Sequence, residues 1–381
     1  MEVIFLDAVT NSRIPGSTGL SDTNWRLAYE LTRLGIDVSV MGLYEKNAAP
    51  PYPNVNFIKI NPPKNKYQNI LTILCQRAIL ALKAKQVQNE KAVFHVSDNY
   101  SAGFLSLMGL GHRTVWQGHS NVLHNSRFGN PWDRSTYLSL RFFLKQAARS
   151  IRHVIALGPS LVYWWKKSGF RSDSIVVIPN GIDPDENMNR VKTINLPRGW
   201  ITKENKILYV GRLSRDKGGY IELLNCLQNL NRIHSNSALL IVGDGPQREE
   251  IEIFSQFHNN PNSVFFLGNQ PKSVVLSIYP RSDLLILPSI NEMMPRVMLE
   301  AWACGTAFMG TNVGAIGDYL IDGQNGYLLS NLGQKYLEQR VKDALEDHQM
   351  RKRIVEKGRR DVRNFCWSII AKEYQQLYSS I

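Results

Sequence analysis

The chain has 381 residues, a length that suits about two domains, each large enough to bury its own core. Its composition, 43% hydrophobic and 20% charged residues, is that of a soluble globular protein. A membrane span needs roughly 18 consecutive apolar residues, and Arg77 and Arg281 interrupt the best candidates, so we expect no transmembrane helix. The acidic, strand-like start MEVIFLDAVT argues against a signal peptide, and we expect a cytoplasmic protein.

The net charge of +13 is concentrated in one part of the chain. Residues 51–152 carry 14 Lys and Arg against three acids. Such a field attracts anions, which include nucleic acid, acidic lipid headgroups and phosphorylated substrates. No nucleic-acid-binding module accompanies it, so we expect lipid or phosphate rather than nucleic acid, with a merely solvated basic face as the open alternative.

Short apolar runs that alternate with helical patterns begin at the N-terminus. Because continuous apolar strands of this length are typical of sheets covered on both faces, the pattern predicts a parallel sheet. The expected strands of this first series are residues 3–6, 38–43, 92–96, 114–118 and 154–157.

A helical segment at residues 67–87 carries much of the basic charge. Apolar residues such as Ile70 and Leu82 are interleaved there with Arg77, Lys83 and Lys85. This composition is typical of a helix that lies on an anionic membrane, and the surrounding residues 59–91 are the candidate contact surface. A core helix with a wet basic face is the alternative, and the sequence leaves both open.

A second series of strand-like runs predicts a second doubly wound α/β domain. We expect an N-terminal domain at residues 1–183, a polar linker at 184–205 that lacks periodicity, and a second domain at 206–366. We expect the amphipathic helix at 367–381 to pack against another element, with the first domain as one candidate. The expected strands of the second series are residues 206–211, 238–243, 264–268, 284–289 and 307–311.

Basic residues and glycines follow the first strand of this second series, in VGRLSRDKGG at residues 210–219. Arg212 offers a planar fork for phosphate oxygens, and Lys217 offers a mobile positive charge. The glycines allow the backbone to approach a ligand closely. A solvated basic loop is the alternative interpretation of these residues alone.

The segment PSINEMMPRVMLEAWACGT at residues 288–306 predicts a strand end, a loop with Glu292 and a helix that begins near Pro295. Ligands bind at the carboxyl ends of strands in open α/β sheets, and helix N-termini attract anions. Glu292 is therefore placed to meet a polar ligand, and Glu300 to accept hydrogen bonds from a ribose. Two solvated surface acids are the alternative.

Taken in order, these segments resemble the retaining glycosyltransferases of family 4, also called glycosyl transferases group 1. The resemblance covers nearly the whole chain and is strongest in VGRLSRDKG, LLIVGDGPQREEIE, VFFLGNQP and NEMMPRVMLEAWACG. It implies the GT-B fold, in which two Rossmann-like domains enclose a cleft. The family's usual Phe-Gly after the first Glu is replaced here by Met294 and Pro295, so we expect the sugar contacts to differ there.

The resemblance also implies the roles of individual residues. Arg212, Lys217, Glu292 and His119, which follows a strand in TVWQGHS, become the candidate catalytic residues. Gly19 matches the glycine of the family's first loop, near the diphosphate. The remaining donor-binding candidates are Gly268, Asn269 and Gln270 near the base, Glu300 at the ribose, and Met294, Pro295, Arg296 and Val297 where the helix begins.

Membership of this family implies transfer of a sugar from a UDP- or GDP-sugar to a hydroxyl of a glycan or lipid-linked acceptor, with retention of configuration. We expect no metal and no cofactor, because the fixed cations stabilise the leaving diphosphate. Cell-surface polysaccharide or glycolipid synthesis is the expected setting, with the protein cytoplasmic or peripheral on the inner face of the membrane. A GT-B sugar-nucleotide epimerase or hydrolase, and a non-catalytic nucleotide-sugar-binding subunit, are the alternatives.

Overall fold

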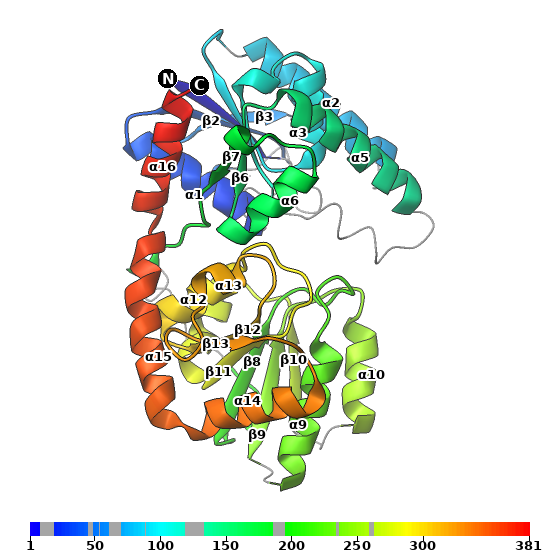
Figure 1. The fold of residues 1–381 in the computed structure, drawn as a ribbon, viewed down its shortest axis with the longest axis vertical. Coiled ribbons are helices and arrows are strands. Elements are labelled where there is room, and N and C mark those ends of the chain that lie inside the picture. Colours follow the sequence, from blue (N-terminus) through cyan, green and yellow to red (C-terminus); the bar gives the residue numbers. More distant parts are fainter. Residues whose placement is uncertain are drawn as a thin grey trace. The chain divides into compact units, whose positions relative to one another are not determined.

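Parallel strands and covering helices form two units in this chain, and each is described by itself (Figure 1). Unit 1 comprises Met1–Gly181 together with Trp367–Ile381, and unit 2 comprises Ile182–Cys366. The structure is a computed structural model. It describes residues 1–7, 19–44, 49–52, 54–60, 70–87, 89–118, 133–185, 195–233, 236–258 and 263–381.

The sheet of unit 1 has the strand order β3-β2-β1-β4-β5-β6-β7, and all its pairings are parallel. Strand β1 lies between β2 and β4, and its four apolar side chains, Val3 to Leu6, are fully buried; Val3 lies opposite both Val38 and Val93. The strands are β1 (Glu2–Asp7), β2 (Asp37–Leu43), β3 (Asn56–Ile60), β4 (Val93–Val96), β5 (Thr114–Gln117), β6 (His153–Ala156) and β7 (Ile175–Val177).

Helices cover both faces of this sheet. Because crossover connections are right-handed, the helix between β1 and β2 lies on one face and the helices that lead to β4, β5 and β6 lie on the other. The helices are α1 (Gly19–Arg33), α2 (Ile70–Val87), α3 (Asn99–Leu107), α5 (Asp133–Ser150), α6 (Val162–Lys167) and α16 (Trp367–Ser379), with single 3₁₀ turns η1 (Gly111–Arg113), η2 (Pro159–Leu161) and η3 (Ser172–Ser174).

The C-terminal helix α16 belongs to unit 1, where it packs against α1 (Figure 1). Its buried Tyr378 bonds through its hydroxyl to Nδ1 of His95, in β4, at 2.7 Å. The His95 ring stacks on Phe5 of β1, with ring centroids 4.5 Å apart, and meets Tyr374 edge-on. The last helix is thereby fastened to the two central strands of the sheet.

The sheet of unit 2 has the order β10-β9-β8-β11-β12-β13, again with parallel pairings. Its strands are β8 (Asn205–Val210), β9 (Ser237–Val242), β10 (Val264–Gly268), β11 (Leu284–Leu287), β12 (Ala307–Thr311) and β13 (Tyr327–Leu329). Its helices are α8 (Arg198–Ile201), α9 (Tyr220–Ile233), α10 (Arg248–His258), α11 (Lys272–Ile278), α12 (Arg296–Cys304), α13 (Ile316–Tyr319), α14 (Gln334–Glu346) and α15 (His348–Asp361), with 3₁₀ turns η4 (Tyr279–Arg281) and η5 (Val362–Phe365).

The α/β class with two doubly wound sheets is confirmed, and each strand expected from an apolar run is present. The strands β3, β7 and β13 were not predicted. All three lie at sheet edges: β7 and β13 have only three residues each, and Lys59 interrupts the apolar residues of β3.

The stretch expected as a linker, residues 184–205, differs from that expectation where it is described. Unit 2 begins at Ile182, which forms a parallel bridge with Cys366. The one-turn helix α8 carries Trp200, which is fully buried and donates from Nε1 to the carbonyl of Ile207 at 3.1 Å. One buried tryptophan anchors this segment to β8, and a single turn is too short to show helical periodicity.

The contact between His95 and Tyr378 yields a stability prediction. Tyr378→Phe should lower the free energy of unfolding by about 1–3 kcal/mol, because it leaves a buried ring nitrogen without its partner. Urea denaturation measures this loss. Tyr163→Phe, at an exposed tyrosine of the same unit, is the control and should change stability by less than about 0.5 kcal/mol. Equal stability of the two variants would show that the hydroxyl does not fasten α16.

Candidate active site

The strand order of unit 2 reverses between β8 and β11, which are hydrogen-bonded neighbours. The chain leaves β8 toward β9 on one side and leaves β11 toward β12 on the other. Loops that diverge in this way leave a crevice at the carboxyl ends of the strands, the usual ligand position in open α/β sheets. The loop after β8 contains Arg212 and Lys217, and the loop after β11 contains Glu292.

Lys217 and Glu292 meet at this point. Nζ of Lys217 lies 2.7 Å from Oε2 of Glu292 and also donates to the carbonyl of Asn291 at 3.3 Å. An ammonium group has three donors, so these two acceptors leave one N–H for a further partner. The Lys217 side chain is partly exposed, and a ligand can therefore reach it.

Two glycines bring the loops close enough for this pairing. Gly218 and Gly219 both have positive φ, 60° and 76°. A Cβ atom at Gly219 would lie 1.7 Å from the carbonyl oxygen of Pro288, so no other residue fits there without a backbone shift. The backbone N–H of Ile290 donates to the carbonyl of Lys217 at 2.7 Å, which fixes the two loops to each other.

Polar groups beside the pair have hydrogen-bonding capacity left over. The hydroxyls of Ser214 and Ser289, one in each loop, are buried and bond to no atom within the described residues. Arg212 is exposed on the same loop as Lys217, and its carbonyl accepts from the Tyr209 hydroxyl at 3.4 Å. Burial, reinforced by the charge of Glu292, raises the pKa of Tyr209, so this phenol stays a neutral donor. A buried hydroxyl without a partner calls for an explanation, and a bound ligand or water is one.

Helix α12 begins directly beyond Glu292. Pro295 is its N-cap residue, with φ −71° and ψ 124°, and no side chain caps the helix. The N–H groups of the first turn have no partner inside an α-helix, and they carry the positive end of its dipole. Met294 is buried, so its side chain faces the core rather than solvent. Arg296 and Val297 are partly exposed in the first turn.

Glu300 lies one turn further along α12, and a hydrogen bond from a buried tyrosine fixes its carboxylate. Its Oε2 accepts from the hydroxyl of Tyr279, in η4, at 2.9 Å, and its Oε1 lies 3.9 Å from Nη2 of Arg296. Tyr279 is fully buried; its burial and the nearby Glu300 charge raise its pKa well above the ordinary value. The phenol therefore remains protonated and donates to the carboxylate, which fixes its orientation.

The expected base-binding loop, Gly268 to Gln270, follows β10, two strands from β8. Gly268 has φ 63°, and its carbonyl accepts from Gly243 N at 2.9 Å, which joins this loop to the loop after β9. Gln270 donates to the carbonyl of Leu267 at 2.7 Å. Asn269 is exposed at the tip. The loop belongs to the same sheet edge as Lys217 and Glu292.

Unit 1 has a buried carboxylate at the equivalent reversal of its own sheet, between β1 and β4. Asp7 ends β1 and accepts from Ser21 at 2.6 Å, Trp25 at 3.1 Å and Asn24 at 3.3 Å, as well as from the Tyr44 hydroxyl. Burial raises the pKa of Asp7. Three of these donors lie on α1, so the carboxylate positions the start of that helix, where Gly19 is the first residue.

The structure thus brings Lys217 and Glu292 together, with Arg212 on the same loop as Lys217 and the N-cap of α12 three residues beyond Glu292. Gly19 belongs to unit 1, and His119 lies outside the described residues. Tyr279, Ser214 and Ser289 were not predicted from the sequence. The two serines lie within the segments 210–219 and 288–306, but nothing in the sequence indicates that their hydroxyls are buried without partners in the described part of the chain, and Tyr279 lies outside both segments. Within the described ranges, no three His, Cys, Asp or Glu side chains are grouped so that they could hold a metal ion.

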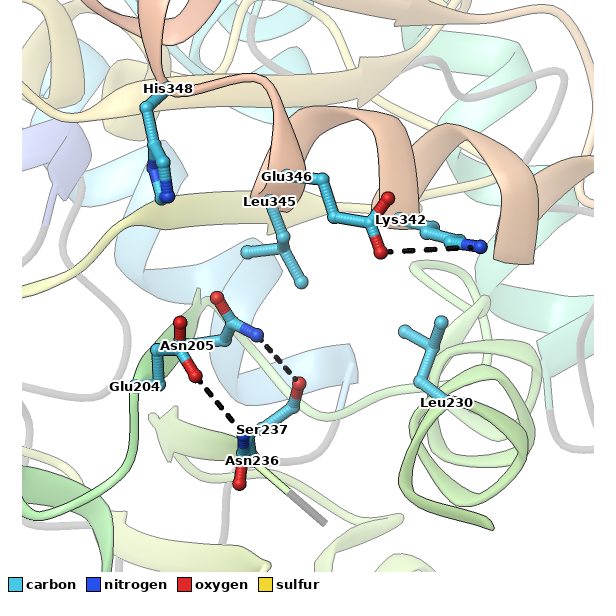
Figure 2. A pocket seen from close by; sticks show the side chains of 9 residues that line it. All are labelled: Glu204, Asn205, Leu230, Asn236, Ser237, Lys342, Leu345, Glu346 and His348. Carbon is cyan, nitrogen blue, oxygen red and sulfur yellow. Dashed lines mark hydrogen bonds and ion pairs between the residues drawn. The ribbon is translucent and has the colours of Figure 1, made fainter. Parts of the chain in front are cut away.

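A pocket of about 320 Å³ lies at the opposite edge of the sheet, where β8 and β9 begin (Figure 2). Its polar side chains bond to one another: Asn205 donates to Ser237 at 3.4 Å, and Asn236 donates to Glu204 at 3.0 Å. Ligands of parallel sheets bind at the carboxyl ends of the strands rather than the amino ends. We therefore assign the candidate site to the Lys217–Glu292 edge.

Two family models match consecutive parts of the chain. Glycosyltransferase Family 4 matches residues 18–186, and Glycosyl transferases group 1 matches residues 193–361. Among curated relatives, glycogen synthase of Mycobacterium tuberculosis is 31% identical over 205 residues, which cover 54% of this chain and 48% of the relative. Phosphatidyl-myo-inositol mannosyltransferase of Mycobacterium leprae is 27% identical over 218 residues, which cover 57% and 56%. The chain thus spans about half the length of these relatives.

Solved structures share the fold over the full chain. Sucrose-phosphate synthase from Thermosynechococcus elongatus has a TM-score of 0.82 at 20% identity and covers 100% of this chain and 98% of its own. Anabaena HepE in complex with UDP-glucose has a TM-score of 0.75 at 20% identity, with 100% of both chains covered. The family matches and the two parallel sheets agree, and the chain belongs to the glycosyl transferases of group 1, with the GT-B fold.

Proposed function

We propose that this chain transfers a sugar from a UDP- or GDP-sugar to a hydroxyl group, with retention of configuration and without a metal ion. The observation that carries the proposal is the Lys217–Glu292 pair at the strand-order reversal of unit 2, beside the start of α12. HepE, a structural neighbour, is known in complex with UDP and with UDP-glucose, which supports a nucleotide-sugar donor.

The positive groups at the carboxyl ends of β8 and β11 match the diphosphate of such a donor. Cleavage of the sugar–phosphate bond leaves negative charge on the diphosphate and an oxocarbenium-like sugar. Lys217, the exposed Arg212 and the N–H groups of α12 supply fixed positive charge where the diphosphate would lie. With these cations in place, the leaving group needs no divalent metal.

Glu292 and Glu300 suit the hydroxyl groups of the donor. Carboxylates accept hydrogen bonds from sugar and ribose hydroxyls, and Glu300 is already oriented by Tyr279. We assign Glu292 to the transferred sugar, Glu300 to the ribose and residues 268–270 to the base. In the retaining route that we propose, the departing phosphate oxygen takes the proton of the acceptor hydroxyl, so no nucleophilic side chain is required. His119, which lies outside the described residues, stays a candidate catalytic residue through the family resemblance alone.

For the acceptor we propose a glycan or a lipid-linked sugar, in cell-surface polysaccharide or glycolipid synthesis. The basic stretch of unit 1 supports an acceptor at an anionic surface. One curated relative is a phosphatidyl-myo-inositol mannosyltransferase, whose name indicates a lipid acceptor. A cytoplasmic protein, peripheral on the inner face of the membrane, is consistent with both.

A donor screen tests this function directly. Thermal-shift measurements with UDP-, GDP- and ADP-sugars should show one nucleotide class that raises the melting temperature, because a ligand of the folded state stabilises it. The stabilising donor is then incubated with candidate acceptors, and the products are analysed by mass spectrometry. Free or altered sugar with every acceptor would favour a hydrolase or epimerase. Binding with no product at all would favour a non-catalytic subunit.

Removal of the paired charges should abolish transfer. Lys217→Ala and Glu292→Ala should each lower kcat by roughly 10²–10³-fold, because fixed charges act on the transition state. Steady-state kinetics and circular dichroism would separate this loss from misfolding. Lys342→Ala, which removes an exposed lysine from α14 of the same unit, is the control and should transfer normally. Near-normal rates of the Lys217 variant would refute the site assignment.

Tyr279, which donates a hydrogen bond to Glu300, should affect donor binding rather than the chemical step. Tyr279→Phe removes the O–H that orients the carboxylate, and should raise the donor KM roughly tenfold with little change in kcat, since a hydrogen bond to a charged group is lost from uniform binding. Tyr327→Phe is the matched control, because the Tyr327 hydroxyl is buried and has no partner among the described residues. A KM that changes equally in both variants would exclude the positioning role.

A further inference from the structure

Helix α2 buries an arginine and exposes two leucines. Its Arg77 is only 2% exposed, and Nε of Arg77 lies 3.3 Å from the carboxylate of Asp98, the N-cap of α3. Its Leu71 and Leu82, in contrast, are 67% and 50% exposed. A surface helix ordinarily faces solvent with its charged side and the core with its leucines, so the exposed apolar face of α2 requires an explanation.

The exposed residues of α2 form one stripe. Leu71, Cys75 and Leu82 are exposed at spacings of four and seven residues, which place them above one another on a helix. Lys83 and Lys85 are exposed at the C-terminal end of the stripe. Apolar and basic side chains therefore face solvent together.

Helix α5 repeats this arrangement. Leu138 and Phe142 are 57% and 50% exposed, one turn apart. Arg141, Lys145 and Arg149 are exposed along the same side of the helix. The opposite side carries Phe143, which packs on Tyr100 and Phe104 of α3 and is buried.

The two stripes belong to one layer. Helix α3 packs against both α2 and α5 and lies between them, on one face of the unit 1 sheet (Figure 1). Its Leu107 is also exposed. Five of the six exposed Leu and Phe side chains in the described ranges lie on these three helices. The side chains described on α2, α3 and α5 include no Asp or Glu; Asp133, the first residue of α5, is not among the described side chains. Where its side chains are described, the outer face of the α2–α3–α5 layer is thus apolar, basic and free of acids.

We infer that this outer face docks on the surface of an anionic phospholipid bilayer. Leucine and phenylalanine side chains enter the boundary between headgroups and acyl chains, while interleaved Lys and Arg side chains bind phosphate groups. The surface expected from the sequence, residues 59–91, is corrected in two respects: Arg77 is internal and cannot touch lipid, and α5 supplies a second stripe. No helix in the described parts of the chain is long and apolar enough to cross a bilayer.

Charge favours a bilayer over a second copy of the chain. A twofold dimer would place this surface against itself, and its Lys and Arg residues would then face one another with no acids to offset them. The phosphates of a nucleic acid would pair with the Lys and Arg side chains, but they would not bury the exposed leucines. An anionic bilayer would do both, because it has phosphate groups at its surface and acyl chains beneath them. The inference does not depend on which sugar is transferred, or on whether transfer occurs.

Co-sedimentation of the full chain with vesicles tests the inference. Wild-type protein should bind vesicles of equal phosphatidylglycerol and phosphatidylcholine, and bind pure phosphatidylcholine at least tenfold more weakly. Two variants address the stripes separately: Leu138→Ser with Phe142→Ser, and Arg141→Gln with Lys145→Gln. Each should need at least tenfold more anionic lipid for half-maximal binding. All four positions are exposed, so thermal unfolding should be unchanged.

Matched controls come from unit 2. Ile253→Ser with Phe257→Ser removes an exposed apolar pair one turn apart on α10, and Lys352→Gln with Arg353→Gln removes two exposed cations from α15. Both should bind vesicles as wild type does. No binding by wild type, or equal binding by wild type and both stripe variants, would overturn the inference. So would equal losses in the α15 control, or a dimer in analytical ultracentrifugation that Leu138→Ser with Phe142→Ser dissociates.

Discussion

The reversal of strand order between β8 and β11 is the constraint on which the candidate site depends. The two strands pair through Ile207 and Leu208 of β8 and Leu284 and Leu285 of β11. These apolar residues are buried, as is typical of strands in the interior of a parallel sheet. Their following loops then diverge toward β9 and β12. Lys217 and Glu292, 75 residues apart in the chain, meet only because these two loops leave adjacent strands. Gly219 makes the contact possible, since any side chain there would collide with Pro288.

The same reversal of strand order also places the start of α12 near the carboxyl ends of these strands. Pro295 begins α12 immediately after the Glu292 loop, and Glu300 lies one turn into that helix. Tyr279, which precedes β11, reaches Glu300 from the buried side of the helix. The reversal of strand order between β8 and β11 therefore brings three features to one end of the sheet: the positive end of a helix dipole, a partly exposed lysine and an oriented carboxylate. An elongated anion with hydroxyl groups is the ligand chemistry that this arrangement fits.

Much of the fold could be predicted because buried parallel strands are continuous apolar runs, such as residues 238–243 and 284–289. The edge strand β7 was not predicted because its three residues, although apolar, are too few to give a clear strand pattern. Lys217 and Glu292 were identified singly, as polar residues after strands, but their pairing depends on strand order, which local sequence does not encode. The contact of Tyr279 with Glu300 and the burial of Arg77 beside Asp98 could not be predicted for a similar reason. In each case the partner is a neighbour only in the folded chain.

Crystal structures of the full chain with UDP and with GDP would show whether the donor diphosphate binds beside Lys217 and Glu292. We expect density for the diphosphate of one of these nucleotides within hydrogen-bonding distance of Lys217 Nζ, at the carboxyl ends of β8 and β11. A nucleotide bound instead in the pocket at the amino ends of β8 and β9, beside Asn205 and Ser237, would contradict this expectation.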